Sequence, residues 1–162
     1  MLNGYRTVFE TSLFSNWTSL ISLAFLGIGL GVTFGWITGR FRPKEKGGCA
    51  LAFMALWSLA WVGASTWWVG SNLKTAWVYT SALRNGRCGI AEGVVRVLRQ
   101  QPAGGHAAGD RVRIGDREFE VNYYRSTLAY NQTIAHGGAL TDGTRARVHY
   151  LDGAILKVEI FR

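Results

Sequence analysis

The chain has 162 residues, a formal net charge of +8 and 48% hydrophobic residues. A length near ~150 residues is typical of one domain, but the first half is apolar and rich in Trp and Gly, whereas polar and apolar residues alternate in the second half. The composition therefore excludes one uniform soluble domain and predicts two physical units, of which the soluble one is small.

Residues 1–17 are predicted to form an N-terminal interfacial segment. Their apolar side chains follow an i, i+3, i+4 pattern, which is typical of a short helix lying at a membrane surface. The alternative is an irregular lead-in to the first apolar segment. The residues that make the pattern are Leu2, Tyr5, Phe9, Leu13 and Trp17.

Two long segments, 11–39 and 47–73, contain no Asp, Glu, Lys, Arg or His. A bilayer core of ~30 Å needs ~20 apolar helical residues, so each segment is long enough to cross it. The alternative, a pair of helices buried in a soluble core, would need far more chain to cover them. The sequence therefore predicts a transmembrane hairpin over residues 18–72, with spans at about 18–38 and 49–71.

Tryptophan side chains lie near the ends of both predicted spans. Trp prefers the interface between water and hydrocarbon, where its ring is apolar and its N–H can find a polar partner. We therefore predict that four residues anchor the hairpin in the membrane: Trp17, Trp36, Trp67 and Trp68.

Basic residues predict the orientation of the hairpin. The connection between the spans carries Arg40, Arg42, Lys44 and Lys46 within seven positions. Positive-inside counting places this basic loop in the cytoplasm and the N-terminus and C-terminal half on the other side. We expect a multi-pass protein of the bacterial inner membrane with its C-terminal domain in the periplasm, joined to the spans by a linker over residues 73–87.

Small residues predict a helix-packing interface. Gly27, Gly31 and Gly35 recur every four positions, which puts them on one helix face where another backbone can approach closely. Ala60 and Ala64 offer the same spacing on the second span. Two uses stay open, namely packing of the two helices on each other and docking against a partner subunit.

Residues 88–162 are predicted to form an extramembrane β domain. Turn dipeptides at Gly115-Asp116 and Asp152-Gly153 are typical of tight hairpins. The predicted fold class is α+β, a two-helix transmembrane hairpin followed by a small antiparallel β-barrel of the OB or SH3-like kind, with an open sheet as the alternative. Five segments alternate polar and apolar residues as half-buried strands do, at 94–99, 111–114, 118–123, 145–150 and 156–160.

The sequence contains few residues in patterns typical of catalytic, metal-binding or cofactor-binding sites. The absence of ionisable residues from both spans argues against transport and against histidine ligation of a membrane cofactor. His106, His136 and His149 lack metal-ligand spacing and are interpreted as surface residues, and no nucleophile motif or phosphate loop is present. We expect no catalytic residues, no metal and no cofactor, and no nucleic acid among the partners.

Motifs in the C-terminal half carry a resemblance to known proteins. The motifs are Glu92-Gly93-x-Val95, Phe119-x-Val121, His136-Gly137-Gly138-x-Leu140-x-Asp142-Gly143, Arg147-Val148-x-Tyr150 and Ile155-Leu156-Lys157-Val158. With these motifs the chain, over most of its length, resembles a family of small uncharacterised bacterial membrane proteins that combine a helical hairpin with a C-terminal β domain. The pattern from Gly143 to Glu159 is more faintly similar to the NfeD-like proteins, which join spanning helices to an OB-type barrel. The resemblance implies architecture and no activity.

These observations favour a non-catalytic accessory or structural subunit of a larger membrane complex, such as a respiratory or photosynthetic one. Its partners would be other integral membrane subunits and the lipid bilayer. The alternative is a free-standing, membrane-anchored binding module whose barrel recognises a peptidic, polysaccharide or lipid ligand.

Overall fold

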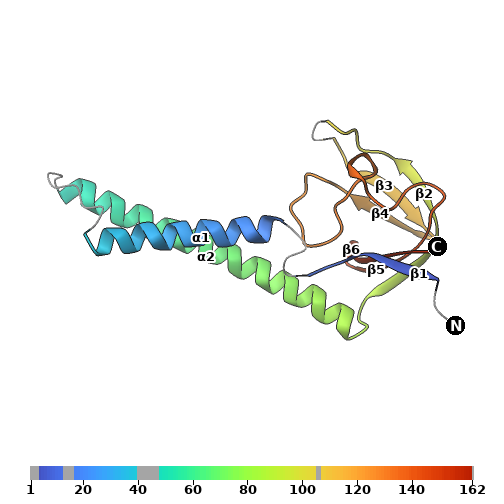
Figure 1. The fold of residues 1–162 in the computed structure, drawn as a ribbon, viewed down its shortest axis with the longest axis horizontal. Coiled ribbons are helices and arrows are strands. Elements are labelled where there is room, and N and C mark those ends of the chain that lie inside the picture. The colour runs from blue at the N-terminus through green and yellow to red at the C-terminus, as the bar shows by residue number, and fades with distance from the viewer. Residues whose placement is uncertain (1–3, 13–16, 40–47, 105–106, 162) are drawn as a thin grey trace. The chain divides into compact units, whose positions relative to one another are not determined.

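The computed structural model describes residues 4–12, 17–39, 48–104 and 107–161. The chain is α+β, with two α-helices and a six-stranded antiparallel sheet in this part (Figure 1). It divides into two compact units. The helical unit comprises Asn16–Lys74, and the β unit comprises Met1–Ser15 together with Thr75–Arg162.

The helical unit consists of α1 (Trp17–Ile37) and most of α2 (Gly48–Arg84), which run antiparallel to each other (Figure 1). Neither helix contains a proline, and both are rich in Leu and Ala, which favour helix. Helix α2 does not break after the predicted second span but continues through most of the expected linker over residues 73–87. It ends at Arg84, and Gly86 follows with a φ of 64°, which is typical of a residue just beyond a helix end.

One helix among the described residues, Ala52–Arg84 within α2, has the length and composition needed to cross a membrane. The described apolar part of α1, Leu23–Ile37, is shorter than that criterion. Both helices are apolar, and their large side chains are mostly exposed.

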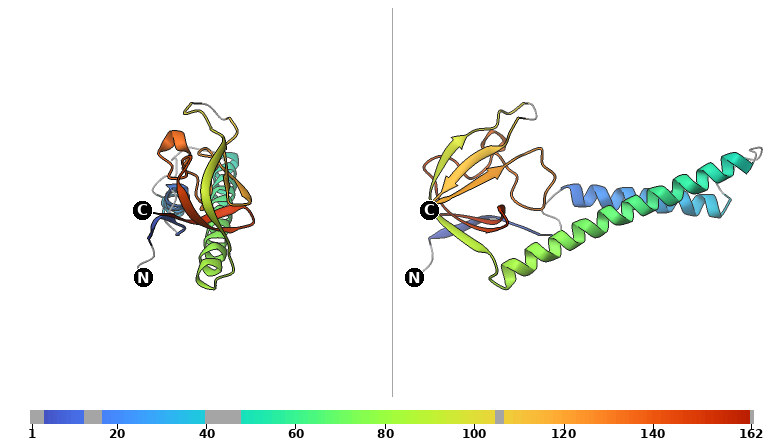
Figure 2. Two further views of the ribbon diagram at one scale, coloured as in Figure 1. Left: turned by 90° about the vertical axis from the view of Figure 1, so that its right-hand side faces the viewer. Right: turned by 180° about the vertical axis from the view of Figure 1, so that it is seen from behind.

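The β unit is a sheet with strand order β1-β6-β5-β2-β3-β4. The first part of β2 pairs with β5, and the part from Val95 onward pairs with β3, so the sheet turns at β2. Figure 2 shows β3 and β4 running in a different direction from β5 and β6. The strands are β1 (Tyr5–Glu10), β2 (Gly89–Arg99), β3 (Asp110–Ile114), β4 (Arg117–Val121), β5 (Arg145–Leu151) and β6 (Ala154–Phe161), with a short 3-10 helix at Ile134–His136.

The expected interfacial helix near the N-terminus is wrong for Tyr5–Glu10, which form strand β1. This strand pairs antiparallel with β6, with Tyr5 opposite Phe161 and Glu10 opposite Lys157. The sheet therefore has six strands instead of the five predicted, and the β unit begins before the helices. The hairpin is an insertion between the first and second strands of one β unit.

The five other strands and both predicted tight turns are confirmed. Gly115, with φ of 62°, takes the first central position of the β3–β4 turn, as type II′ geometry requires. Asp152 (φ 50°) and Gly153 (φ 80°) form the β5–β6 turn, where positive φ at both positions is typical of type I′. The curled sheet encloses a core of Ala91, Val95, Val112, Ile114, Phe119, Val121, Tyr130, Leu140, Ala146, Val148, Ile155 and Val158.

Candidate interaction surfaces

Helices α1 and α2 contact each other at Gly29 and Trp61. A Cβ atom added at Gly29 would overlap the Trp61 indole ring, so only glycine lets that ring lie against α1. The Trp61 Nε1–H donates a hydrogen bond of 3.1 Å to the carbonyl of Phe25. The rings of Phe25 and Trp61 stack with centroids 5.6 Å apart.

The contact face of α2 repeats every seven residues. Ser58 and Ser65 are buried, Trp61 is half-buried, and Trp68 reaches the Phe25 ring with centroids 6.4 Å apart. Alternating spacings of three and four are the signature of antiparallel or parallel helices packed side by side. The small serines allow close approach of the backbones, and the tryptophans fill the space between them.

The predicted small-residue interface is only partly used within the chain. Gly35 is buried, but a Cβ atom added at Gly27 or Gly31 would meet no atom within 4 Å. Ala60 and Ala64 are exposed. Four-residue spacing of small side chains therefore does not mark the α1–α2 contact, and docking of a partner on these positions stays a prediction.

The remaining surface of both helices exposes many large apolar side chains. Trp67 is 81% exposed and Trp68 is 42% exposed, whereas Trp36 is half-buried. The side chain of Trp17 and the predicted basic loop, Arg40, Arg42, Lys44 and Lys46, lie outside the described residues. Further large apolar side chains that are exposed include Leu23, Phe25, Ile28, Leu30, Val32, Phe34, Ile37, Phe53, Met54, Leu56, Trp57 and Leu59.

A polar cluster on the outer face of the sheet ties β1 to the rest of the β unit. The Tyr5 hydroxyl donates a hydrogen bond of 2.6 Å to Glu92 on β2, and Arg147 on β5 pairs with the same carboxylate at 2.8 Å. The Arg147 guanidinium also lies over the Tyr5 ring, 4.3 Å from its centroid. The hydrogen bond from Tyr5 and then that from Arg147 lower the pKa of the Glu92 carboxyl below its ordinary value. The cluster therefore reinforces the β1–β6 pairing.

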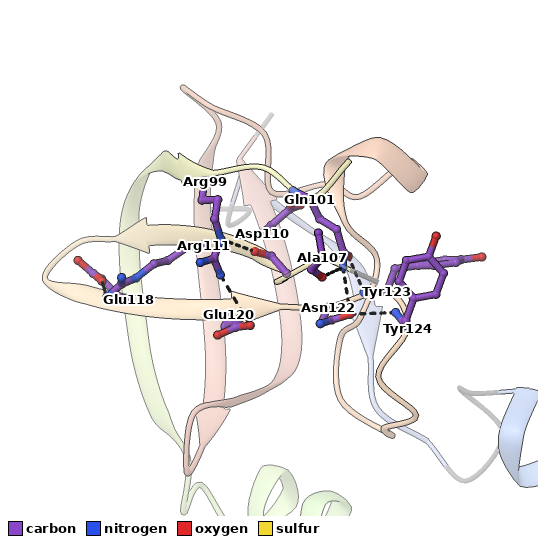
Figure 3. A network of polar contacts seen from close by, with 11 residues as sticks. Arg99, Gln101, Ala107, Asp110, Arg111, Glu118, Glu120, Asn122, Tyr123 and Tyr124 are labelled. Atoms are coloured by element: carbon purple, nitrogen blue, oxygen red, sulfur yellow. Dashed lines mark hydrogen bonds and ion pairs between the residues drawn. The ribbon is translucent and has the colours of Figure 1, made fainter. Parts of the chain in front are cut away.

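A second polar network braces the loops at one end of β3 and β4 (Figure 3). Gln101 is fully buried, and Asp110 is 2% exposed. One carboxylate oxygen of Asp110 accepts the backbone N–H of Gln101 at 2.6 Å, and the other accepts that of Ile134 at 2.6 Å. The Gln101 side chain donates to Ala107 at 2.6 Å and accepts the backbone N–H of Tyr123 at 3.1 Å. Because these side-chain atoms form hydrogen bonds with backbone groups, the network stabilises the conformation of the loops.

A cluster of three rings, those of Tyr123, Tyr124 and His136, lies next to this polar network. The His136 ring stacks on Tyr123 with centroids 3.7 Å apart, and Tyr124 lies edge-on to both rings. His136 Nδ1 is 2.7 Å from the hydroxyl of Thr133, which is fully buried. His136 is thus half-buried and not simply a surface residue.

The two other histidines that were predicted to be surface residues are His149 and His106. His149 lies 3.5 Å from Glu159 on the outer face of the sheet, and His106 falls outside the described residues. In the described ranges no three metal-ligating side chains of the His, Cys, Asp and Glu types come together.

No protein family, curated protein or solved structure matches this chain. The function is therefore argued from the surfaces of the two units.

Gly29→Ala should weaken the α1–α2 contact, because its new methyl group must displace the Trp61 ring. Overpacking of this kind costs about 1–3 kcal/mol. The measurement is the thermal stability of the detergent-solubilised chain, together with the emission wavelength of its tryptophans. Gly27→Ala is the matched control, since it changes helix propensity equally in open space. Equal effects of the two substitutions would contradict the assigned contact.

Glu92→Gln should lower the midpoint of thermal unfolding at pH 7 but have little effect at pH 2. Folding lowers the pKa of this carboxyl, so its contribution is complete above the unfolded value of ~4.3 and is lost as the pH falls through the lower folded value. Circular dichroism of both proteins across this pH range measures the difference. A midpoint difference that does not change with pH would show that the charge of Glu92 is irrelevant.

Proposed function

We propose that the chain is an integral membrane protein whose helices α1 and α2 cross the bilayer as a hairpin and carry the β unit on one side. The observation that supports this most directly is the exposure of many large apolar side chains on both helices. In the most apolar window of α2, only 11% of the residues are buried. The core helix of a soluble protein would be mostly buried, whereas lipid covers such a helix without any protein partner.

The pairing of β1 with β6 supports two crossings instead of one. Strand β1 precedes α1, and the other strands follow α2, yet all six strands form one sheet. If α2 alone crossed the membrane, β1 and β6 would lie on opposite sides and could not pair. If α2 crosses the membrane, as its length and composition allow, α1 has to return the chain across the same bilayer.

The helix lengths agree with this arrangement. At 1.5 Å per residue, the 21 residues of α1 extend about 32 Å, which is close to the ~30 Å of a hydrocarbon core. The 37 residues of α2 extend about 56 Å and exceed one crossing. The excess lies at the C-terminal end of α2, where Lys74 is the first ionisable residue and Thr75–Arg84 belong to the β unit.

The proposed location is the bacterial inner membrane, with the basic loop Arg40–Lys46 in the cytoplasm and the β unit, whose curled sheet is proposed to be OB-like, in the periplasm. Four cationic side chains in one short connection are retained on the cytoplasmic side during insertion.

The proposed role is that of a non-catalytic accessory subunit in a larger membrane complex, of the respiratory or photosynthetic class. Gly27 and Gly31 leave open space on α1, and Ala60 and Ala64 are exposed on α2, so a neighbouring helix can approach both. Neither predicted span carries an ionisable residue that could move protons or ions. A membrane-anchored binding module is the second candidate, and it is favoured by a groove beside β4.

Cysteine labelling in intact spheroplasts tests the topology. In a background with Cys49 and Cys88 replaced by serine, single cysteines are placed by Thr7→Cys, Asp116→Cys and Lys44→Cys. A membrane-impermeant maleimide should label the first two from outside and the third only after permeabilisation, because β1 and the β3–β4 turn share one side. Labelling of Thr7→Cys and Asp116→Cys from opposite sides would contradict the hairpin.

Purification from native membranes in mild detergent tests the accessory role. The full chain should elute in a particle larger than one chain plus its micelle, and mass spectrometry should identify the same integral membrane subunits in repeated preparations. Gly27→Leu with Gly31→Leu should release them, because leucine fills the open face, whereas Leu30→Ile keeps that face unchanged. A monodisperse single chain from native membranes would refute the role in a complex.

A further inference from the structure

Strand β4 is an edge of the sheet, and its free side can be assigned from the turn that precedes it. Ile114 and Arg117 flank a two-residue turn and are direct partners in the β3–β4 ladder. In such a hairpin the flanking pair exchanges both backbone hydrogen bonds, and the pattern alternates along the strands. The backbone groups of Arg117, Phe119 and Val121 therefore point toward β3, and those of Glu118 and Glu120 point away from it.

A groove runs along this free edge. It has a volume of about 470 Å³, and one of its sides is lined by the consecutive residues Glu118, Phe119 and Glu120. Successive side chains of a strand point to opposite faces, so three in a row can line a groove only through the edge of the strand. The other side includes Arg125 and the β5–β6 turn at Asp152. In the described part of the chain, no backbone hydrogen bond from that side reaches Glu118 or Glu120.

We propose that this groove receives an extended peptide segment of a partner protein, which adds to the sheet as a strand beside β4. The exposed N–H and C=O groups of Glu118 and Glu120 present two donors and two acceptors, spaced as a neighbouring strand requires. A five-residue strand of about 17 Å limits the recognised segment to about five residues.

The two edges of the sheet differ in how they are protected. Natural edges are protected by bulges, proline, charged side chains or covering segments. The β1 edge carries a register shift between Thr7 and Phe9. Strand β4 carries charged side chains, but it contains no proline, and its register with β3 is regular over all five pairs. The backbone of the β4 edge is therefore the more regular template for another strand.

The acidic residues of the groove favour a peptide segment with basic side chains. The acidic residues Glu118, Glu120 and Asp152 and the basic residue Arg125 line the groove, and three further arginines, Arg99, Arg111 and Arg113, pair with the two glutamates. Glu118 is compensated by Arg111 at 2.7 Å and Arg113 at 2.5 Å on the sheet face. Glu120 is only loosely paired, 3.8 Å from Arg99, and Asp152 is exposed. Lysine side chains on the added strand would meet these two carboxylates.

This inference deepens the binding role among the proposed functions, but it depends only on contacts within the β unit. Loss of the membrane topology would leave it standing, and its failure would leave the membrane proposal intact. The two are therefore tested by separate readouts on the same full-length chain.

The test is a titration of the full chain in detergent micelles with an octapeptide in which lysine alternates with valine and threonine, up to millimolar concentration. Amide hydrogen exchange should slow at Glu118 and Glu120 and change little at Arg117 and Phe119, whose N–H groups are already used by β3. An otherwise identical peptide with glutamate in place of lysine should bind at least tenfold more weakly.

Two variants at one position separate backbone recognition from side-chain recognition. Glu120→Pro removes an N–H that points into the groove without removing a ladder bond, and it should abolish peptide binding. Glu120→Ala keeps that N–H and should retain binding within a few-fold, and circular dichroism checks that both variants fold. Equal loss in the two variants, no protection at Glu118 and Glu120, or peptide-free protection that rises with protein concentration, which would indicate pairing of two copies, would each overturn the proposal.

Discussion

The pairing of β1 with β6 is the constraint on which the rest of the molecule depends. It joins a strand that precedes both helices to the last strand of the chain, so the two ends of the helical segment meet in one sheet. The entropic cost of closing a loop rises only slowly with its length, so a long hairpin can be inserted here at little extra cost. Tyr5, Glu92 and Arg147 add a charged hydrogen-bonded cluster to that junction, which makes β1 part of the β unit.

Close packing of complementary side chains contributes more to the contact between α1 and α2 than polar interactions do. Lipid tails are as apolar as the side chains they surround, so the hydrophobic effect does not drive helices together in a bilayer. The contact is instead a glycine that admits an indole ring, with the hydrogen bond from Trp61 to the Phe25 carbonyl. If the chain is the proposed membrane subunit, the open space at Gly27 and Gly31 is where a partner helix would pack.

Much of the architecture follows from local sequence patterns, and the misses have identifiable physical causes. Uncharged segments predict α1 and α2, and two-residue alternation with tight turns predicts β2 to β6. Strand β1 was missed because Tyr5 and Phe9 lie four residues apart, as on a helix face, while the strand's partner lies at the other end of the chain. The buried positions of Gln101 and Asp110 depend on loops that meet only in the folded state, so no local pattern reveals them.

The two edges of the sheet differ in structure, and the proposed anchoring and the proposed recognition belong to different edges. At one edge, β1 is bulged, paired with β6 and continuous with the chain that leads into α1. At the other edge, β4 is regular and borders a groove into which the backbone groups of Glu118 and Glu120 point. An added strand would continue the ladder through β3 and β2 to the strands that hold the hairpin. Strand addition at β4 therefore extends the sheet without displacing any contact that the anchored end requires.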